Sequence, residues 1–136
     1  MPVKTFKFHP DIFKNEVTWR PYILIKLGNK NKWSPNFIRA LVDSGADSNV
    51  FPSQFAKEIG LDYKKGKAEQ VTGIGDKHSL VYVNIVKIRL ETKEFETVIK
   101  FGEEIRIPLL GRDGFFNYFK KVSFSVKERE IEIKFK

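Results

Sequence analysis

Residues 37–52 read FIRALVDSGADSNVFP, a run in which an apolar strand is followed at once by an acid, a hydroxyl and a glycine. Its first part, up to Val42, has apolar side chains on both faces of an extended chain. This pattern predicts a strand buried on both sides and is too short for a free-standing helix. Asp43, Ser44 and Gly45 then end the strand. A carboxylate is left at the mouth of an apolar element, where water can reach it but charge is costly, and this placement indicates a chemical site more than a packing role.

Length and composition indicate one globular domain. The chain has 136 residues, of which 41% are apolar and 13 are phenylalanine, enough to bury a single core. It has no cysteine and only two histidines, so neither disulfides nor a metal site are expected. No apolar run approaches the ~20 residues of a membrane span, and residues 1–5 lack the apolar centre of a signal peptide. We therefore expect a single domain over residues 1–136 that is cytoplasmic and has no metal, cofactor or membrane partner.

The net charge of +8, from 25 lysines and arginines, raises the question of a nucleic-acid partner, because such residues neutralise phosphates. The lysines, however, flank expected turns or alternate with apolar residues, as solvent-facing strand positions do. We interpret them as a solvated surface and expect no nucleic-acid partner. The alternative is a basic β domain that binds nucleic acid. It would be favoured by an affinity for nucleic acid that falls steeply with salt and is unchanged by Asp43→Asn.

The rest of the chain alternates short apolar runs with polar turns. The expected strands cover residues 4–8, 20–27, 37–42, 78–90, 94–101 and 105–110, with a hairpin tip at 73–76 and a one-face-buried hairpin over 122–135. Short helices are expected at residues 53–60 and 114–119. Strands this closely spaced and joined by polar turns indicate a mostly antiparallel β protein.

Three motifs occur in an informative order along the chain. They are the segment LVDSGA at residues 41–46, the glycine-rich tip VTGIGD at residues 71–76, and IPLLGRD at residues 107–113. Together they resemble the retropepsin-like aspartic proteases, over roughly residues 22–119. Residues 1–19 are then an N-terminal extension, and residues 122–136 form a C-terminal hairpin.

The resemblance implies a closed acid-protease-like β-barrel with a flap hairpin and one or two short helices. It also implies an aspartic endopeptidase that activates water with Asp43 and needs no cofactor. Peptide hydrolysis by this mechanism needs two carboxyls, one to take a proton from water and one to donate to the carbonyl. The chain holds one such motif, so we expect a homodimer in which the Asp43 residues of two copies form a shared dyad.

The resemblance assigns further roles around Asp43. Ser44 and Gly45 are expected to support the catalytic loop, and a structural ion pair is expected between Asp47 and Arg112. The residues expected to bind an extended peptide substrate are Ala46, Asp47, Gly73, Ile74 and Gly75. The candidates for lining its side-chain subsites are Val42, Val50, Ile74 and Leu110. The terminal hairpin is expected to contribute to the sheet between subunits.

Each motif taken alone has a simpler explanation, because Asp, Ser and Gly favour ordinary turns and Leu-Leu-Gly is usual in a core. Their order and spacing favour the protease hypothesis. The alternative is a non-catalytic peptide-binding module of the same fold, in which Asp43 is unpaired. Dimerisation accompanied by peptide cleavage would separate the two hypotheses.

Overall fold

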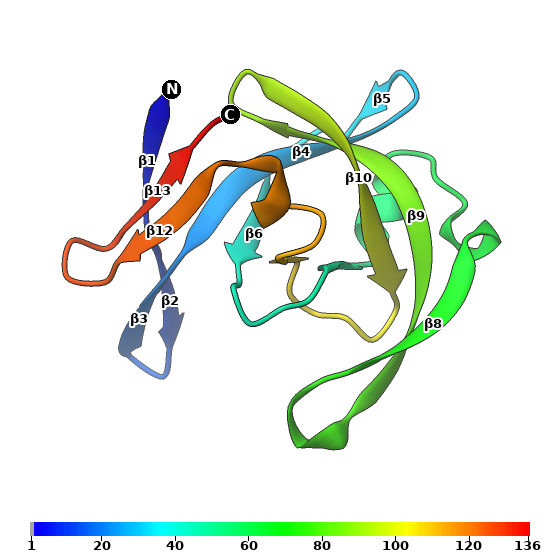
Figure 1. The fold of residues 1–136 in the computed structure, drawn as a ribbon. Helices are drawn as coiled ribbons and strands as arrows, with labels where there is room; N and C mark the ends of the chain where they lie inside the picture. The colour runs from blue at the N-terminus through cyan, green and yellow to red at the C-terminus, as the bar shows by residue number, and fades with distance from the viewer. Residues whose placement is uncertain (1) are drawn as a thin grey trace.

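The computed structural model describes residues 2–136, which form a mostly β fold (Figure 1). The strands are β1 (Val3–Lys7), β2 (His9–Phe13), β3 (Glu16–Arg20), β4 (Tyr22–Asn29), β5 (Lys32–Trp33), β6 (Ile38–Val42), β7 (Asn49–Pro52), β8 (Lys67–Thr72), β9 (His78–Leu90), β10 (Lys93–Gly102), β11 (Leu109–Leu110), β12 (Lys121–Ser125) and β13 (Glu130–Lys134). The helix α1 covers Gln54–Glu58, and short 3-10 helices cover Tyr63–Lys65, Ile74–Asp76 and Phe116–Tyr118.

Six strands close into a barrel in the order β4, β6, β11, β7, β10, β9 and back to β4. The closure is made by β4, whose residues 22–25 pair with β6 and whose residues 26–28 pair with β9. The pairs β6–β11 and β7–β10 are parallel and the other pairs are antiparallel, so the barrel is mixed. The prediction of a mostly β, closed-barrel fold with a short helix is confirmed.

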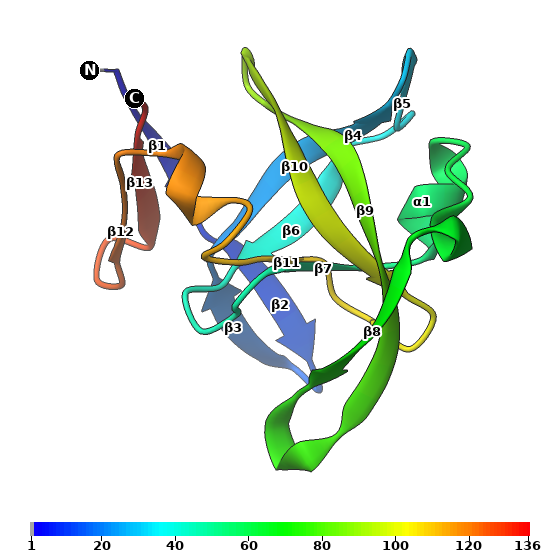
Figure 2. The same ribbon diagram turned by 45° about the vertical axis from the view of Figure 1, so that its right-hand side comes forward.

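The barrel interior is filled by alternate residues of its strands, as a closed sheet requires. Ile23, Ile25, Ile88 and Ile99 are completely or almost completely buried there, and Phe101 packs edge-on against Phe51 with ring centroids 6.4 Å apart. One end is covered by the turn of helix at 54–58 (Figure 2). No helix in residues 2–136 has the length and apolarity needed to cross a membrane.

A second sheet, in the order β1, β13, β12, lies beside the barrel at the left of both views (Figures 1 and 2). Its central strand buries Ile131 and Ile133, and Phe135 packs edge-on against Phe119 at 5.3 Å between ring centroids. The predicted C-terminal hairpin is therefore confirmed as β12–β13. The two termini lie side by side, with the Phe135 amide donating to the Pro2 carbonyl at 3.0 Å.

Three sequence expectations are wrong in detail. β6 is not buried on both sides, since it alternates: Arg39 is exposed and pairs with Asp11 at 2.7 Å. The strand expected at 105–110 is only Leu109–Leu110, because the chain before Pro108, which has no amide hydrogen, remains a loop. The segment 114–119 forms only a single 3-10 turn.

The strands β2, β3, β5 and β7 were not predicted from the sequence. Residues 9–20 form a separate two-stranded sheet, the β2–β3 hairpin, which contains a proline and is mostly exposed. Its turn is made by Lys14 and Asn15, both with positive φ, as in the type I′ turns that suit two-residue hairpins.

Candidate active site

Asp43 is fixed by the strands on both sides of β6. The Leu41 amide donates to the Pro108 carbonyl at 2.8 Å, and the Asp43 amide donates to the Leu110 carbonyl at 3.0 Å. On the opposite side, the Val42 amide donates to the Pro21 carbonyl at 2.9 Å. Three consecutive amides are thus held by neighbouring strands, so the backbone that carries the carboxylate is rigid although Asp43 itself follows the strand.

The turn after Asp43 orients its carboxylate. The Gly45 amide donates to Asp43 Oδ1 at 2.9 Å, and the Ala46 amide donates to the Asp43 carbonyl at 3.1 Å. Asp43 is half-buried, whereas Ser44 and Gly45 are exposed. A carboxylate at the end of a barrel strand is therefore held by one backbone donor and remains open to water, as an acid or base for hydrolysis needs to be.

The segment after the turn is tied to the segment after β11. The Arg112 amide donates to the Ala46 carbonyl at 3.0 Å, and the Asp113 amide donates to the Asp47 carbonyl at 2.9 Å. Gly111 is required here because a Cβ at this position would lie 2.5 Å from the Ser48 carbonyl oxygen. The Asp47 and Arg112 side chains also form an ion pair. These side chains are 89% and 59% exposed, so the backbone bonds hold the two loops together more than the ion pair does.

Asn49 supports the site from below, and the sequence analysis did not identify it. Its side chain is fully buried; Nδ2 donates to the Val98 carbonyl at 3.1 Å, and Oδ1 accepts from the Gly111 amide at 2.9 Å. It therefore links β7, β10 and the chain just after β11. One indication of this role is visible in the sequence, since Asn49 is the single polar residue in the otherwise apolar run 49–52.

The second part of the candidate site is the long β8–β9 hairpin. Its last cross-strand pair is Thr72 with His78, and the Gly73 amide donates to the Lys77 carbonyl at 2.8 Å. At the tip, Gly75 has φ of 75°, which favours glycine, and the Ile74 side chain is fully exposed. Figures 1 and 2 show this hairpin projecting beyond the barrel at the end where the loop after β6 lies.

Two of the residues expected to line the substrate subsites lie on the inner face of the barrel. Val42 and Leu110 are wrong as subsite residues, because both are buried in the barrel core. Their neighbours Leu41 and Leu109 point to the other face and are half-buried, in register with each other and, through Leu109, with Val50. A strand presents alternate residues to its two faces, so Leu41, Val50 and Leu109 share the outer face, where they form an apolar wall.

A charged pair lies further along the same face. Lys100 is paired with Val50 in the parallel register, and its ammonium lies 3.0 Å from the carboxylate of Glu69 on β8. This ion pair connects the hairpin to the barrel wall. Sequence reasoning missed it because the two residues are far apart in the chain.

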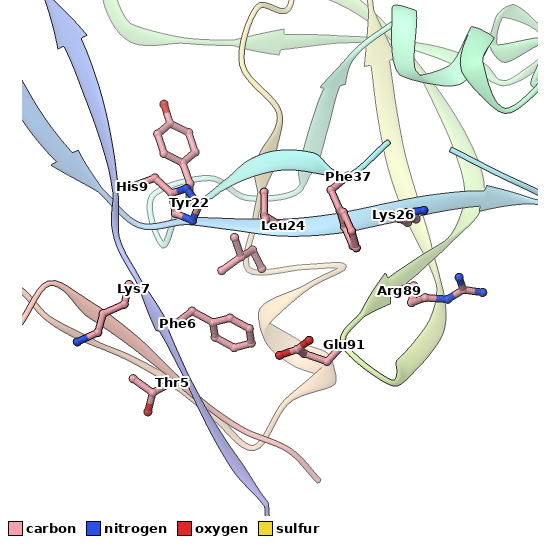
Figure 3. A pocket seen from close by; sticks show the side chains of 11 residues that line it. Thr5, Phe6, Lys7, His9, Tyr22, Leu24, Lys26, Phe37, Arg89 and Glu91 are labelled. Carbon is pink, nitrogen blue, oxygen red and sulfur yellow. The ribbon is translucent and has the colours of Figure 1, made fainter. Parts of the chain in front are cut away.

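A cavity lies elsewhere, away from Asp43 and the hairpin tip. It has a volume of about 490 Å³ and lies along β1 and the outer face of β4, where Phe6, Leu24 and Phe37 meet Lys26 and Glu91 (Figure 3). None of its lining residues belongs to the loop 43–47 or to the tip 73–76. Within residues 2–136, no group of three or more histidine and acidic side chains is arranged to hold a metal ion.

Comparison with known proteins agrees with this geometry. A family model described as aspartyl protease matches residues 34–113, more than half of the chain. No curated protein matches the sequence.

Solved structures show the same fold. A retropepsin-like aspartic protease from Rickettsia conorii is 18% identical over 97% of this chain and 91% of its own, with a TM-score of 0.66. EIAV protease, solved with the inhibitor HBY-793, is 20% identical over 68% of this chain and 82% of its own, with a TM-score of 0.52. The family match over 34–113 spans Asp43, the β8–β9 hairpin and Arg112, and the chain therefore belongs to the aspartyl protease family, with the fold of the retropepsin-like enzyme from Rickettsia conorii.

Proposed function

We propose that the chain is a homodimeric aspartic endopeptidase whose water-activating dyad consists of Asp43 from each of two copies. The observation that carries the proposal is the placement of Asp43, half-buried at the end of β6 and held by the Gly45 amide. Two carboxyls about 3 Å apart cannot both ionise easily, so they share a proton and can act as base and acid together. One chain supplies one such carboxyl, and a two-fold axis would supply the other.

The remaining site residues would act on the substrate and on the dyad. Ser44, next to Asp43 and exposed, would hydrogen-bond across the axis and fix the two loops. An extended peptide would lie along Ala46 and Asp47 as an added strand, with alternate side chains against the wall of Leu41, Val50 and Leu109. Such binding would use the same backbone groups for many peptide sequences.

The β8–β9 hairpin would serve as the flap over this peptide. Ile74 projects fully into solvent at its tip, between Gly73 and Gly75, and closure over a substrate would bury it. Closure would also exclude water from the reacting bond. The Glu69–Lys100 ion pair would hold the base of the flap against the barrel wall while its tip moves.

The test is hydrolysis of a denatured protein substrate by the native chain and by Asp43→Asn, from about pH 3 to pH 8, with the dimer content of each preparation measured. We expect cleavage by the native dimer with an acidic to mildly acidic optimum, since the dyad must hold one proton, and none by Asp43→Asn. Equal cleavage by both would remove Asp43 from the mechanism. Peptide binding by a native dimer that never cleaves would leave the non-catalytic peptide-binding module instead.

A further inference from the structure

The β2–β3 hairpin has two chemically different faces. Its register pairs Pro10 with Trp19 and Ile12 with Val17, so these four side chains share one face of the ribbon. Ile12 is 71% and Val17 51% exposed. Most residues on the opposite face are polar or charged. The result is an apolar face on a ribbon that its own chain leaves open to solvent.

The polar face is anchored to the barrel through Asp11. Its carboxylate accepts from the Tyr22 hydroxyl at 2.8 Å and forms ion pairs with Arg39 at 2.7 Å and Arg20 at 2.9 Å. Burial raises the pKa of Asp11, but the hydrogen bond from Tyr22 and the charges of Arg39 and Arg20 outweigh it and place the pKa below its usual range. The polar face is thereby turned toward β4 and β6, and the apolar face is turned away from them.

The base of the hairpin, where β3 ends, lies next to the residue proposed for the dyad. Arg20, its last residue, precedes Pro21, whose carbonyl accepts from the Val42 amide at 2.9 Å, and Val42 precedes Asp43. Each strand of five residues is about 16 Å long. Figures 1 and 2 show the hairpin projecting at the same end of the barrel as the flap. If the Asp43 residues of two copies meet, a ribbon of this length that starts beside them extends onto the partner.

The apolar face is also continuous with the C-terminal hairpin. The Arg129 guanidinium lies over the Trp19 ring, 4.5 Å from its centroid, and joins β3 to the turn between β12 and β13. Val126, in the same turn region, is itself largely exposed. A two-stranded ribbon is at best marginally stable alone in water. A surface that packs on the exposed apolar face of such a ribbon would therefore stabilise it.

We infer that the β2–β3 hairpin is an arm that packs its Pro10, Ile12, Val17 and Trp19 face against a second copy of this chain. The inference rests on the proposed function, because the shared dyad sets the position of the partner. By two-fold symmetry each dimer contains two such arms, so one substitution in the sequence changes two contacts in the dimer. The arms would hold the two subunits together beside the dyad, in addition to any contact made by the strands at the termini.

The test compares the dimer dissociation constant of the full-length native chain with that of the double variant Ile12→Ser, Val17→Ser, by sedimentation equilibrium. Four apolar side chains would lose their contacts in each dimer. We therefore expect the dissociation constant to rise by about 100-fold or more. Ile85→Ser is the matched control, because Ile85 is 64% exposed on β9, on the other side of the barrel, and its dissociation constant should be unchanged. Far-UV circular dichroism and thermal unfolding of the variants would show that they remain folded.

A second measurement does not depend on weakening the dimer. The native chain has no cysteine, so Val17→Cys and Ile85→Cys can each carry a single spin label. We expect dimer formation to immobilise the label at position 17 and to leave the label at position 85 unchanged. Equal mobility at position 17 in monomer and dimer would overturn the inference.

The outcomes also separate the inference from the proposed function. A native dimer that cleaves through Asp43 but whose dissociation constant ignores the hairpin variant would overturn the arm and leave the enzyme intact. A hairpin variant that raises only the KM for peptides would show that the face binds substrate, which also overturns the arm. A native chain that stays monomeric at millimolar concentration would overturn both.

Discussion

Replacing Asn49 by alanine is expected to be among the most destabilising polar substitutions in this chain. The side chain is fully buried and makes two hydrogen bonds, of 3.1 Å to the Val98 carbonyl and 2.9 Å from the Gly111 amide. The bond to the Val98 carbonyl contributes about 1 kcal/mol, and leaving the buried Gly111 amide without an acceptor costs about 1–3 kcal/mol. We therefore expect Asn49→Ala to lower the free energy of unfolding by about 3 kcal/mol.

The measurement is urea unfolding at one fixed protein concentration, since dimerisation makes apparent stability depend on concentration. Asn29→Ala is the matched control, because Asn29 is half-buried and makes one longer bond, of 3.3 Å, to the Ile59 carbonyl. The control should lose no more than about 1 kcal/mol. A loss below about 1 kcal/mol for Asn49→Ala, with an unchanged urea dependence, would refute the reasoning.

Three further predictions concern the exposed ion pair, the flap tip and Asp11. Arg112→Leu should lower the free energy of unfolding by less than about 1 kcal/mol, because the ion pair with Asp47 is exposed; a loss above about 2 kcal/mol in urea unfolding would contradict this. Gly75→Ala should destabilise the flap tip by about 1 kcal/mol, because φ is 75° there, whereas Gly73→Ala should have a smaller effect; amide hydrogen exchange at the tip would distinguish them, and equal effects would count against the turn geometry. The Asp11 carboxylate stabilises the fold fully above about pH 4, the usual pKa of an aspartate, and this stabilisation is lost as the pH falls through the lower pKa of the folded state. The difference in free energy of unfolding between the native chain and Asp11→Asn, measured in urea, should therefore be smaller at about pH 2.5 than at about pH 7, and a larger difference at the lower pH would contradict this.

The barrel strands β4, β6, β9 and β10 were predictable because they carry a strong apolar pattern between polar turns. The runs that became β4, β9 and β10 were placed within a few residues, and the hairpin at 122–135 followed from the alternation that ends in the buried pair Ile131 and Ile133. The β2–β3 hairpin was missed because its apolar face is not buried within the chain. An exposed ribbon containing Pro10 carries little of the burial pattern on which strand prediction depends.

The position of Asp43 was predictable from its motif, but the environment around it was not. Choosing Val42 and Leu110 as subsite residues, where the structure has Leu41 and Leu109, reflects an error of one residue in strand parity, which exchanges core and surface. Asn49 and the Glu69–Lys100 pair depend on contacts between strands distant in the sequence. Such contacts are decided by the closed barrel and leave no local pattern.

The central claim, an active site shared by two copies, is tested most directly by mixing native chain with Asp43→Asn at constant total concentration and measuring initial rates of hydrolysis. If the dyad needs one Asp43 from each copy, mixed dimers are inactive and the rate follows the square of the native fraction, so about one-quarter of the activity remains at an equal mixture. A rate proportional to the native fraction, with about one-half remaining, would mean that each chain acts alone and would contradict the account.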